Sequence, residues 1–350
     1  MDRKVKVGIR GIAGLLGKRL AREIRKQPDM EIAFGILRCD STLEMLLSSP
    51  TDLSWMKEMP LYLDDKTERI KECNESQKEI SFKSANTDLN LKDECDILID
   101  AASPGTREKW DERYRGFKKP VIIQSGEYPY GRLVSPPLIE EGHGNIYRQG
   151  GCILSGVSPV LAALKEEMKG VRIHVLMQYD KKLNDFPTNQ KIHSIYLDDT
   201  SGEILRKEVQ SLLNGKEVIV EGMLQVPGLD YYVVTFHLDT KRLLNGKVLR
   251  EYLESRPRIN IAPENFSSTY EIDHLLREQA QAIGKSIPPI VVYGCDLDYV
   301  VPRENNIRLR IAIYSRMIAV LQNIDAIRML ANGTMPVDAM KITDEYAGFV

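Results

Sequence analysis

A cysteine near the middle of the chain has the sequence setting of a nucleophile. Cys152 follows Gly150-Gly151 and precedes residues 160–168, which have the composition of a helix. The sequence therefore predicts that its side chain lies at or just before a helix N-terminus. The positive end of a helix dipole stabilises a thiolate, which is the nucleophilic form of cysteine. The alternative is an inert cysteine among apolar neighbours, and spacing alone leaves both interpretations open.

Glycines at the start of the chain form a second candidate site. Gly11, Gly14 and Gly17 follow a predicted strand at 5–9 and precede a predicted helix at 18–27. A dinucleotide-binding loop requires this context, because glycine lets a diphosphate approach the backbone and the helix N-terminus offers unpaired N–H groups. The other interpretation is a tight turn without a ligand. The predicted cofactor contacts in this loop are Gly8, Gly11, Ala13, Gly14 and Leu15.

The end of the next predicted strand, 32–37, is where such folds bind the adenosine ribose. An acidic residue there accepts hydrogen bonds from the 2′-hydroxyl of NAD, whereas a cation pairs with the 2′-phosphate of NADP. Arg38 favours NADP, and Asp40 leaves NAD open. The predicted cofactor is therefore NADP, with NAD as the alternative.

Two further strands, 96–100 and 120–124, end in small and polar residues. Ligands of open parallel sheets collect at such carboxyl ends, so Ser103, Pro104 and Ser125 are predicted cofactor contacts. The polar stretch 41–95 between these strands and the glycine loop predicts a solvated helix and connections without chemistry. Strands that alternate with helices predict an α/β fold with a doubly wound parallel sheet.

The second half of the chain predicts an α+β domain with mostly antiparallel strands and helices on one face. The predicted strands are 172–177, 218–225, 231–238, 289–293 and 307–314, and the predicted helices are 203–213, 246–253, 269–283 and 316–331.

Composition excludes several classes of protein. A chain of 350 residues with a formal net charge of −2 has no bulk basic field for nucleic acid or anionic membranes. No apolar run approaches the length of a membrane span, and the first residues lack a signal-peptide core. The five cysteines lack a CxxC pair, so neither a metal site nor a disulfide framework is predicted. We expect a soluble, cytoplasmic protein.

Taken together, the segments resemble the glyceraldehyde-3-phosphate dehydrogenase superfamily, and most of all its archaeal branch, along nearly the whole chain. The segments that carry the resemblance are VKVGIRG, GKRLAREI, DMEIAFGI, CDILIDAASPG, KKPVIIQSGEY, GGCILSGVSPVLAALK, NFSSTYEIDHLLREQ and NIDAIRML. The resemblance implies a Rossmann domain over 1–151 and a catalytic and oligomerisation domain over 152–314. It further implies a C-terminal helix, within 315–350, that packs back on the Rossmann domain, and a homo-oligomer, either tetramer or dimer.

The resemblance places the catalytic cysteine of the family on Cys152. In the family the thiolate attacks an aldehyde to give a thiohemiacetal, hydride passes to the nicotinamide, and phosphate releases the thioester. This chain departs from the pattern: Ile153 and Leu154 replace the residues that orient the substrate, and the phosphate-binding arginines fall on Gln178 and Tyr179. The catalytic histidine is not retained, and Ser315 replaces the glutamine that meets the nicotinamide. Oxidation of glyceraldehyde 3-phosphate itself is therefore not expected.

Other residues are candidates for the missing proton transfer. Tyr179 is a predicted proton donor and His193 is the nearest histidine after the cysteine; each has an ordinary packing or surface role as its alternative. The first hypothesis is an NAD(P)-dependent oxidoreductase that uses Cys152 to oxidise an aldehyde, a small-molecule carbonyl substrate, or to reduce the corresponding acyl form. The alternatives are an NADP-dependent imine or ketone reductase without a covalent step, and a non-catalytic dinucleotide-binding protein.

Overall fold

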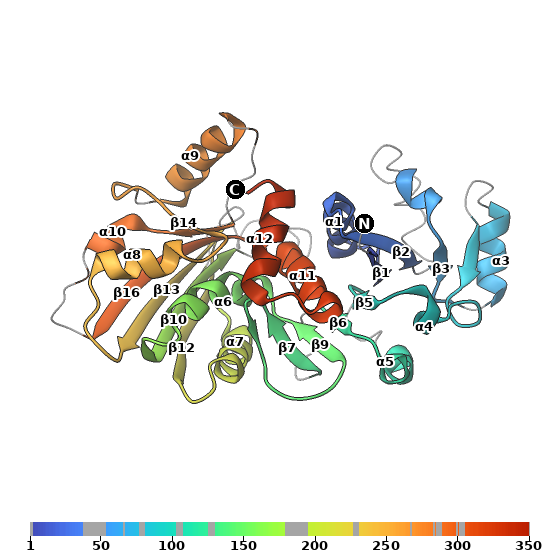
Figure 1. The fold of residues 1–350 in the computed structure, drawn as a ribbon, viewed down its shortest axis with the longest axis horizontal. Helices are drawn as coiled ribbons and strands as arrows, with labels where there is room; N and C mark the ends of the chain where they lie inside the picture. Colours follow the sequence, from blue (N-terminus) through green and yellow to red (C-terminus); the bar gives the residue numbers. More distant parts are fainter. Residues whose placement is uncertain are drawn as a thin grey trace. The chain divides into compact units, whose positions relative to one another are not determined.

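The computed structural model describes residues 3–37, 54–65, 67–76, 81–102, 108–124, 130–178, 195–226, 231–266, 268–282, 284, 289–298, 300 and 305–349. Contacts between residues divide the chain into two compact units. Unit 1 comprises Met1–Arg132, Gly142–Gln149 and Asn323–Met335, and unit 2 comprises Leu133–Glu141, Gly150–Gln322 and Pro336–Val350. A sheet lies at the centre of each unit (Figure 1).

The sheet of unit 1 is parallel and doubly wound. Within this unit the strands follow the order β4-β3-β2-β1-β5-β6-β9, and every pair among these seven strands with a recorded register is parallel. The strands are β1 Val5–Arg10, β2 Met30–Leu37, β3 Leu61–Leu63, β4 Phe82–Ser84, β5 Ile97–Asp100, β6 Val121–Ile123 and β9 Ile146–Gln149. Because β1 lies between β2 and β5, the direction of winding reverses there, which is the switch point where such sheets bind ligands. The predicted fold of this half is confirmed.

Helices on this sheet are held by buried apolar faces. Helix α1 (Leu15–Lys26) buries Leu20, Ala21 and Ile24 and ends in two basic residues that suit the negative end of its dipole. Helix α5 (Asp111–Phe117) contributes Tyr114 and Phe117 to a core shared with residues of β2, β3 and β6. The remaining helices are η1 Ser54–Glu58, α3 Thr67–Ser76, α4 Leu91–Glu94 and η2 Glu108–Trp110.

Unit 2 contains a seven-stranded mixed sheet in the order β11-β12-β10-β13-β16-β15-β14. The strands are β10 Met168–Gln178, β11 Tyr196–Leu197, β12 Glu217–Val226, β13 Tyr231–Thr240, β14 Ile259–Ile261, β15 Ile290–Val292 and β16 Asn306–Tyr314. The central pairs β10–β13 and β13–β16 are antiparallel. A short antiparallel pair, β7 (Arg132–Ser135) with β8 (Leu138–Ile139), precedes this sheet in the chain. The predicted α+β fold is confirmed, but the expectation of helices on one face is wrong, because Ile272 of the helix Thr269–Ala282 packs on the other face of the sheet.

The helices of unit 2 cover the two faces of this sheet unequally. Residues of α6, α7 and α8 share one large apolar core with the inward side chains of β10, β13 and β16. A smaller cluster on other residues of the sheet includes Ile272 of α9. The helices are α6 Cys152–Leu164, α7 Asp199–Leu212, α8 Gly246–Glu254, α9 Thr269–Ala282, α10 Gly294–Asp298, α11 Ser315–Asn332 and α12 Pro336–Ala347. The part of α11 that begins at Asn323 belongs to unit 1.

One expectation about unit 1 is wrong. The stretch 41–95 was expected to be a solvated helix with connections, apart from a strand-like signal at 80–83, yet β3 lies between β2 and β4 with Leu61, Tyr62 and Leu63 all buried. Three residues are too few for a period-2 pattern to stand out, and the neighbours in the tertiary structure, not the local sequence, bury them.

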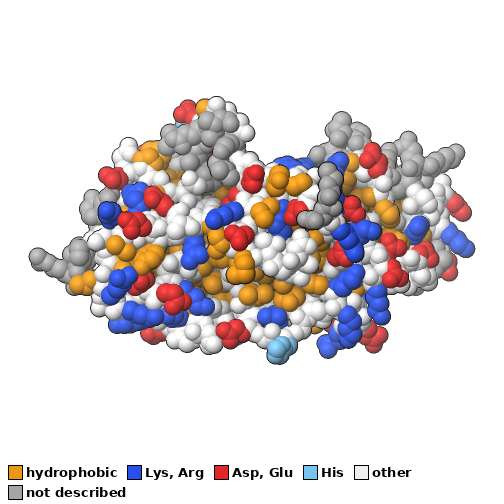
Figure 2. Space-filling view, viewed as in Figure 1, with side chains coloured by type: hydrophobic (Ala, Val, Ile, Leu, Met, Phe, Trp, Pro, Cys, Tyr) orange, Lys and Arg blue, Asp and Glu red, His pale blue; other side chains and the backbone are white. Residues whose placement is uncertain are grey.

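The surface shows both signs of charge. Figure 2 shows Lys and Arg side chains beside Asp and Glu side chains over much of the face in view, in keeping with the net charge of −2. Among the helices that the structure describes, none is both long and apolar enough to cross a membrane.

Candidate functional site

The glycine loop of unit 1 connects β1 to α1 in a conformation that needs its glycines. Gly11 has φ +78°, and a Cβ added there would lie 2.6 Å from the backbone nitrogen of Ala102. A Cβ on Gly17 would lie 2.2 Å from the carbonyl oxygen of Gly11. Both positions therefore exclude any side chain, and the turn brings the first turn of α1 directly against the end of β1.

The N-terminus of α1 is open in the way that an anion site requires. Gly14 is the N-cap; no described side chain caps the helix, and its first turn holds no acidic residue. Leu15, the first helical residue, is 73% exposed. The backbone N–H groups and the positive dipole end are therefore available to a diphosphate, so this loop fits the dinucleotide that the sequence predicts.

Other predicted contacts in this loop have packing roles. A Cβ on Gly8 would lie 2.4 Å from the ring of Phe34, so this glycine makes room for a core aromatic side chain. Ala13 is fully buried in the turn. Any contact of Gly8 or Ala13 with a cofactor is therefore expected to come from backbone atoms, and it stays a prediction.

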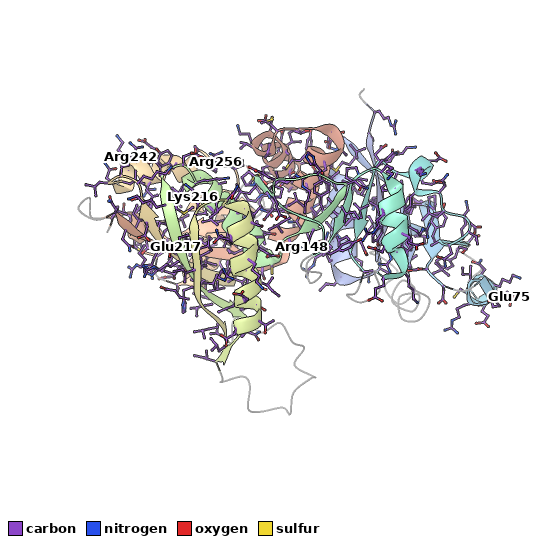
Figure 3. The ribbon with its side chains drawn as sticks, turned by 90° about the horizontal axis from the view of Figure 1, so that it is seen from below. Glu75, Arg148, Lys216, Glu217, Arg242 and Arg256 are labelled. Carbon is purple, nitrogen blue, oxygen red and sulfur yellow. The ribbon has the colours of Figure 1, made fainter. Side chains whose placement is uncertain are left out.

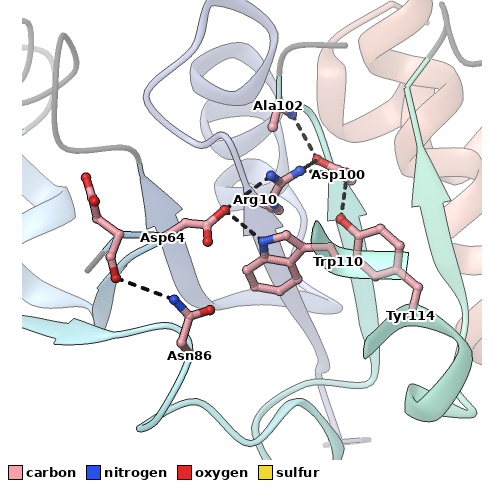
Figure 4. A network of polar contacts seen from close by, with 8 residues as sticks. Arg10, Asp64, Asn86, Asp100, Ala102, Trp110 and Tyr114 are labelled. Carbon is pink, nitrogen blue, oxygen red and sulfur yellow. Dashed lines mark hydrogen bonds and ion pairs between the residues drawn. The ribbon is translucent and has the colours of Figure 1, made fainter. Parts of the chain in front are cut away.

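A buried ionic network, which the sequence interpretation missed, lies at the carboxyl ends of β1, β3 and β5 (Figure 4). The guanidinium of Arg10 donates from Nη1 to both carboxylate oxygens of Asp100, at 3.0 Å each, and from Nη2 to Asp64 at 3.2 Å. The side chains of Arg10 and Asp100 are 3% and 4% exposed. A buried cation with two carboxylates offsets the cost of desolvation only with such close geometry.

Aromatic side chains complete this network. The indole of Trp110 donates to Asp64 at 2.7 Å, and the guanidinium carbons of Arg10 and Arg113 lie 5.1 and 4.2 Å from the centroid of its ring. Tyr114 donates its hydroxyl to Asp100 at 2.6 Å. Cation–π contacts of this kind stabilise a cation most when it is desolvated.

The electrostatics of the network raise the pKa values of Arg10 and Tyr114. Burial opposes the charge on Arg10, but Asp100, followed by Tyr114 and Asp64, raises the pKa of Arg10 above its ordinary value. Burial, reinforced by the Asp100 carboxylate, raises the pKa of Tyr114. Both directions favour a charged Arg10 and a neutral Tyr114 that donates its hydroxyl to Asp100.

The network fixes the backbone at the switch point. Asp100 accepts a hydrogen bond at 3.0 Å from the backbone N–H of Ala102, the residue against which Gly11 packs. The turn after β5 and the turn after β1 are thus held together through Arg10 and Asp100. These are the two backbone segments that the sequence assigns to the cofactor.

In unit 2, Cys152 is the first residue of α6, so it lies at a helix N-terminus as predicted, but the helix spans Cys152–Leu164 and not the expected 160–168. Gly151 is the N-cap; no described side chain caps the helix, and its first turn has no acidic residue. The cysteine is partly buried and packs against the core, whereas residues 154–161 of α6 are fully buried. The location therefore favours the thiolate, because the dipole of a 13-residue helix points its positive end at the sulfur.

A tyrosine of the neighbouring sheet meets the sulfur. The Sγ of Cys152 lies 3.5 Å from the Oη of Tyr232, in the range of a hydrogen bond to sulfur. Tyr232 is the second residue of β13 and is 6% exposed. The sequence marked this segment as a strand but did not single out Tyr232. The available signal was only that a buried tyrosine needs a hydrogen-bond partner for its hydroxyl.

The structure does not describe every predicted site residue. Ser315 is the partly buried first residue of α11 in unit 2. The predictions at Arg38, Ser103, Pro104, Ser125, Tyr179 and His193 fall outside the described residues.

One strong pKa shift in unit 2 belongs to an ion pair distant from Cys152. Arg242, followed by Tyr252, lowers the pKa of Glu167 to about 2. Figure 3 labels Arg242 and, in the same unit, Lys216, whose ammonium donates to the carbonyl of Met168. Arg242 follows Thr240 at the end of β13, and about 27 Å of extended strand separates Thr240 from Tyr232. These groups therefore stabilise the far end of the sheet and are no part of the Cys152 site.

The fold and the two sites define the class: a doubly wound α/β unit with an open glycine loop, together with an α+β unit that carries a cysteine at a helix N-terminus. No protein-family model matches the chain. The glyceraldehyde-3-phosphate dehydrogenase of Sulfolobus acidocaldarius is 26% identical over 355 residues, covering 98% of this chain and 96% of that protein. That of Pyrobaculum neutrophilum is 26% identical over 344 residues, covering 95% and 93%.

Solved structures give the same picture for the fold. Aspartate-semialdehyde dehydrogenase with NADP from Candida albicans superimposes with a TM-score of 0.62 at 11% identity, covering 99% of this chain and 100% of that one. Aspartate-semialdehyde dehydrogenase II from Vibrio cholerae, complexed with ASA, has a TM-score of 0.59 at 11% identity, covering 94% and 99%. The resemblance to the glyceraldehyde-3-phosphate dehydrogenase superfamily is thereby confirmed.

Proposed function

We propose that the protein is an NAD(P)-dependent oxidoreductase that acts on an aldehyde through Cys152. The observation that carries the proposal is the position of Cys152 at the N-terminus of α6, which no described side chain caps, within hydrogen-bond distance of a buried hydroxyl. The relatives named glyceraldehyde-3-phosphate dehydrogenase support the same class of reaction.

Cys152 supplies the nucleophile. Its sulfur attacks the carbonyl carbon of the aldehyde, and the product is a thiohemiacetal on the enzyme. A bound nicotinamide supplies the acceptor for the hydride that leaves this carbon. The thioester that results is released by water or phosphate, which regenerates the thiol.

The glycine loop holds the diphosphate of the cofactor. The open N–H groups of α1, with Gly11 and Gly14 in the turn, carry this role, and Leu15 lies at the first exposed position of the helix. Arg38 selects the 2′-phosphate of NADP, with NAD as the alternative cofactor. Ser103, Pro104, Ser125 and Ser315 are proposed as the remaining contacts.

The substrate is an aldehyde that need not carry a phosphate. Ile153 and Leu154, which follow Cys152, are packed in or against the apolar core of unit 2 and offer no polar side chain to a substrate. An anion clamp of arginines is also not expected at Gln178 and Tyr179 from the sequence. We therefore expect the substrate to be an uncharged aldehyde, or an aldehyde whose charged group is bound by other residues.

Substitution of the cysteine tests the proposal. Cys152→Ser is expected to reduce aldehyde-dependent formation of NADPH, followed by its absorbance, by at least about 1,000-fold while binding of NADP changes less than twofold. Cys295→Ser, at the other partly buried thiol of unit 2, is the matched control and keeps its activity. Full activity of the Cys152→Ser variant overturns covalent catalysis and favours the imine or ketone reductase.

A further inference from the structure

The hydroxyl of Tyr232 and the thiol of Cys152 come from two elements that pack on each other. Both residues belong to the apolar core of unit 2, Tyr232 within it and Cys152 against its edge. The Sγ–Oη distance is 3.5 Å, although 80 residues separate the two in the chain. A phenol next to a nucleophilic sulfur is a group that can exchange a proton with it.

The alternation of β13 makes this contact specific to Tyr232. Its neighbour Tyr231 belongs to a different cluster and donates its hydroxyl to Asp273 of α9 at 3.1 Å. Successive residues of a strand point to opposite faces, so Tyr231 and Tyr232 turn their hydroxyls to opposite sides of the sheet. The cysteine and α6 lie on the Tyr232 side.

The described histidines are placed elsewhere. His237 is an odd-numbered residue of β13 and shares the face of Tyr231, and His174 of β10 pairs with Thr235 on that same face. His143 and His274 are exposed, on a loop and on α9. Within the part of the chain that the structure describes, the proton-exchanging side chain recorded beside Sγ is therefore a phenol.

We propose that Tyr232 is a catalytic residue that relays the proton of the Cys152 thiol. The role rests on the proposed function. As the bond between Sγ and the carbonyl carbon forms and the carbonyl π bond breaks, the thiol proton passes to the phenol oxygen. The phenol passes its own proton to the aldehyde oxygen, so the neutral thiohemiacetal forms and no electron is gained or lost by the protein.

The same hydroxyl stabilises the thiolate before substrate arrives. When Cys152 ionises, Tyr232 donates its O–H to the sulfur, and a hydrogen bond to the charged form of a group favours that form. A hydrogen bond to a charged partner has an effect of about one pH unit on the ionisation. This effect is measurable without cofactor, substrate or turnover.

The test is the rate of alkylation of Cys152 by iodoacetamide as a function of pH in full-length protein, with the modified peptide quantified by mass spectrometry. Tyr232→Phe keeps the ring and removes the hydroxyl. We expect the midpoint of its alkylation profile to rise by about one pH unit relative to the unsubstituted protein. Tyr231→Phe, the matched control on the opposite face, keeps the midpoint of the unsubstituted protein.

A second readout separates a chemical role from a structural one. In aldehyde oxidation, Tyr232→Phe is expected to lower kcat by about 100-fold, the usual contribution of a general acid–base group, while KM changes less than about threefold. Alkylation profiles of Tyr232→Phe and unsubstituted protein that superimpose overturn the role of Tyr232. Failure of the unsubstituted protein to oxidise any aldehyde overturns the proposed function instead. The alkylation profile does not depend on turnover, so it still tests the contact between Tyr232 and Cys152.

Discussion

A single guanidinium nitrogen of Arg10, Nη1, lies 3.0 Å from both carboxylate oxygens of Asp100 in the interior of unit 1. The two residues end adjacent parallel strands, β1 and β5, at the point where the sheet reverses its winding. The contact thus joins the strand that enters the glycine loop to the strand whose following turn packs on Gly11. The geometry of the predicted cofactor site depends on this pair.

Removing one partner of the pair leaves a buried charge without compensation. Arg10→Met is expected to lower the free energy of unfolding of unit 1 by about 3–5 kcal/mol, measured by urea denaturation with the fluorescence of Trp110, which contacts Arg10. The double variant Arg10→Met with Asp100→Leu recovers part of this loss, because the more deeply buried carboxylate is removed, while Asp64 keeps its hydrogen bond from Trp110. Arg69→Ala, at an exposed pair with Glu72, is the control and changes the free energy by less than about 1 kcal/mol.

Substitution by alanine at two glycines of unit 1 is expected to have different effects on the binding of NADP. Gly11→Ala places a Cβ 2.6 Å from the backbone of Ala102 at a positive φ, so the turn has to shift and the diphosphate contacts are lost. We expect binding of NADP, measured by calorimetry, to weaken at least tenfold.

Gly116 of α5 is the matched control, because an added Cβ there meets nothing within 4 Å. Gly116→Ala is expected to keep the affinity for NADP and to raise stability by about 0.5–1 kcal/mol through the better helix propensity of alanine. Equal affinity of the two variants for NADP would place the cofactor away from the loop.

The choice of coenzyme is predicted to depend on Arg38. If this residue pairs with the 2′-phosphate, Arg38→Ala weakens NADP by about tenfold or more and leaves NAD within about twofold. Calorimetry with both coenzymes measures the ratio. An equal loss for the two would exclude contact with the 2′-phosphate.

The ion pair of Glu167 gives unit 2 a defined acid dependence. Arg242, with Tyr252, holds the pKa of Glu167 at about 2, below its ordinary value of 4.5. The folded state therefore binds this proton less readily than the unfolded state, so the stabilisation is complete above about pH 4.5 and is lost as the pH falls toward 2.

Thermal unfolding between pH 5 and pH 2 measures this contribution. Glu167→Gln should be less stable than the unsubstituted protein at pH 5, and the difference should shrink as the pH falls. Glu166→Gln, at the exposed neighbouring position, is the control with no such difference. If the difference in unfolding temperature between Glu167→Gln and unsubstituted protein stays constant from pH 5 to pH 2, the low pKa is not that of Glu167.

Local patterns of the sequence predicted most of the fold. The strands of the Rossmann-like sheet are continuous apolar runs such as Ile97–Asp100, and α1 has apolar residues at helical spacing, so both are visible in a short window. The position of Cys152 at the beginning of α6 was predictable for the same reason. β3 was not, because its burial comes from the strands on either side of it.

The contacts of the site were beyond local patterns. Arg10 reads as a surface charge at the end of a strand, and its partners Asp64 and Asp100 are 54 and 90 residues away. In the sequence, Tyr232 is one of two adjacent tyrosines in a predicted strand. Only the packing of β13 against α6 shows which of the two contacts Cys152. Contacts between residues that are distant in the chain depend on the topology of the fold. The hydrophobic periodicity of a single segment carries no information about them.

The central claim is that an aldehyde is oxidised while bonded to Cys152, with a dinucleotide on the glycine loop. Mass spectrometry of protein quenched in acid during turnover of an aldehyde with saturating NADP tests it most directly. The account predicts an added acyl group on the peptide that contains Cys152, absent without NADP and absent in Cys152→Ser. Turnover of the aldehyde with this peptide unmodified at every time point would contradict the account.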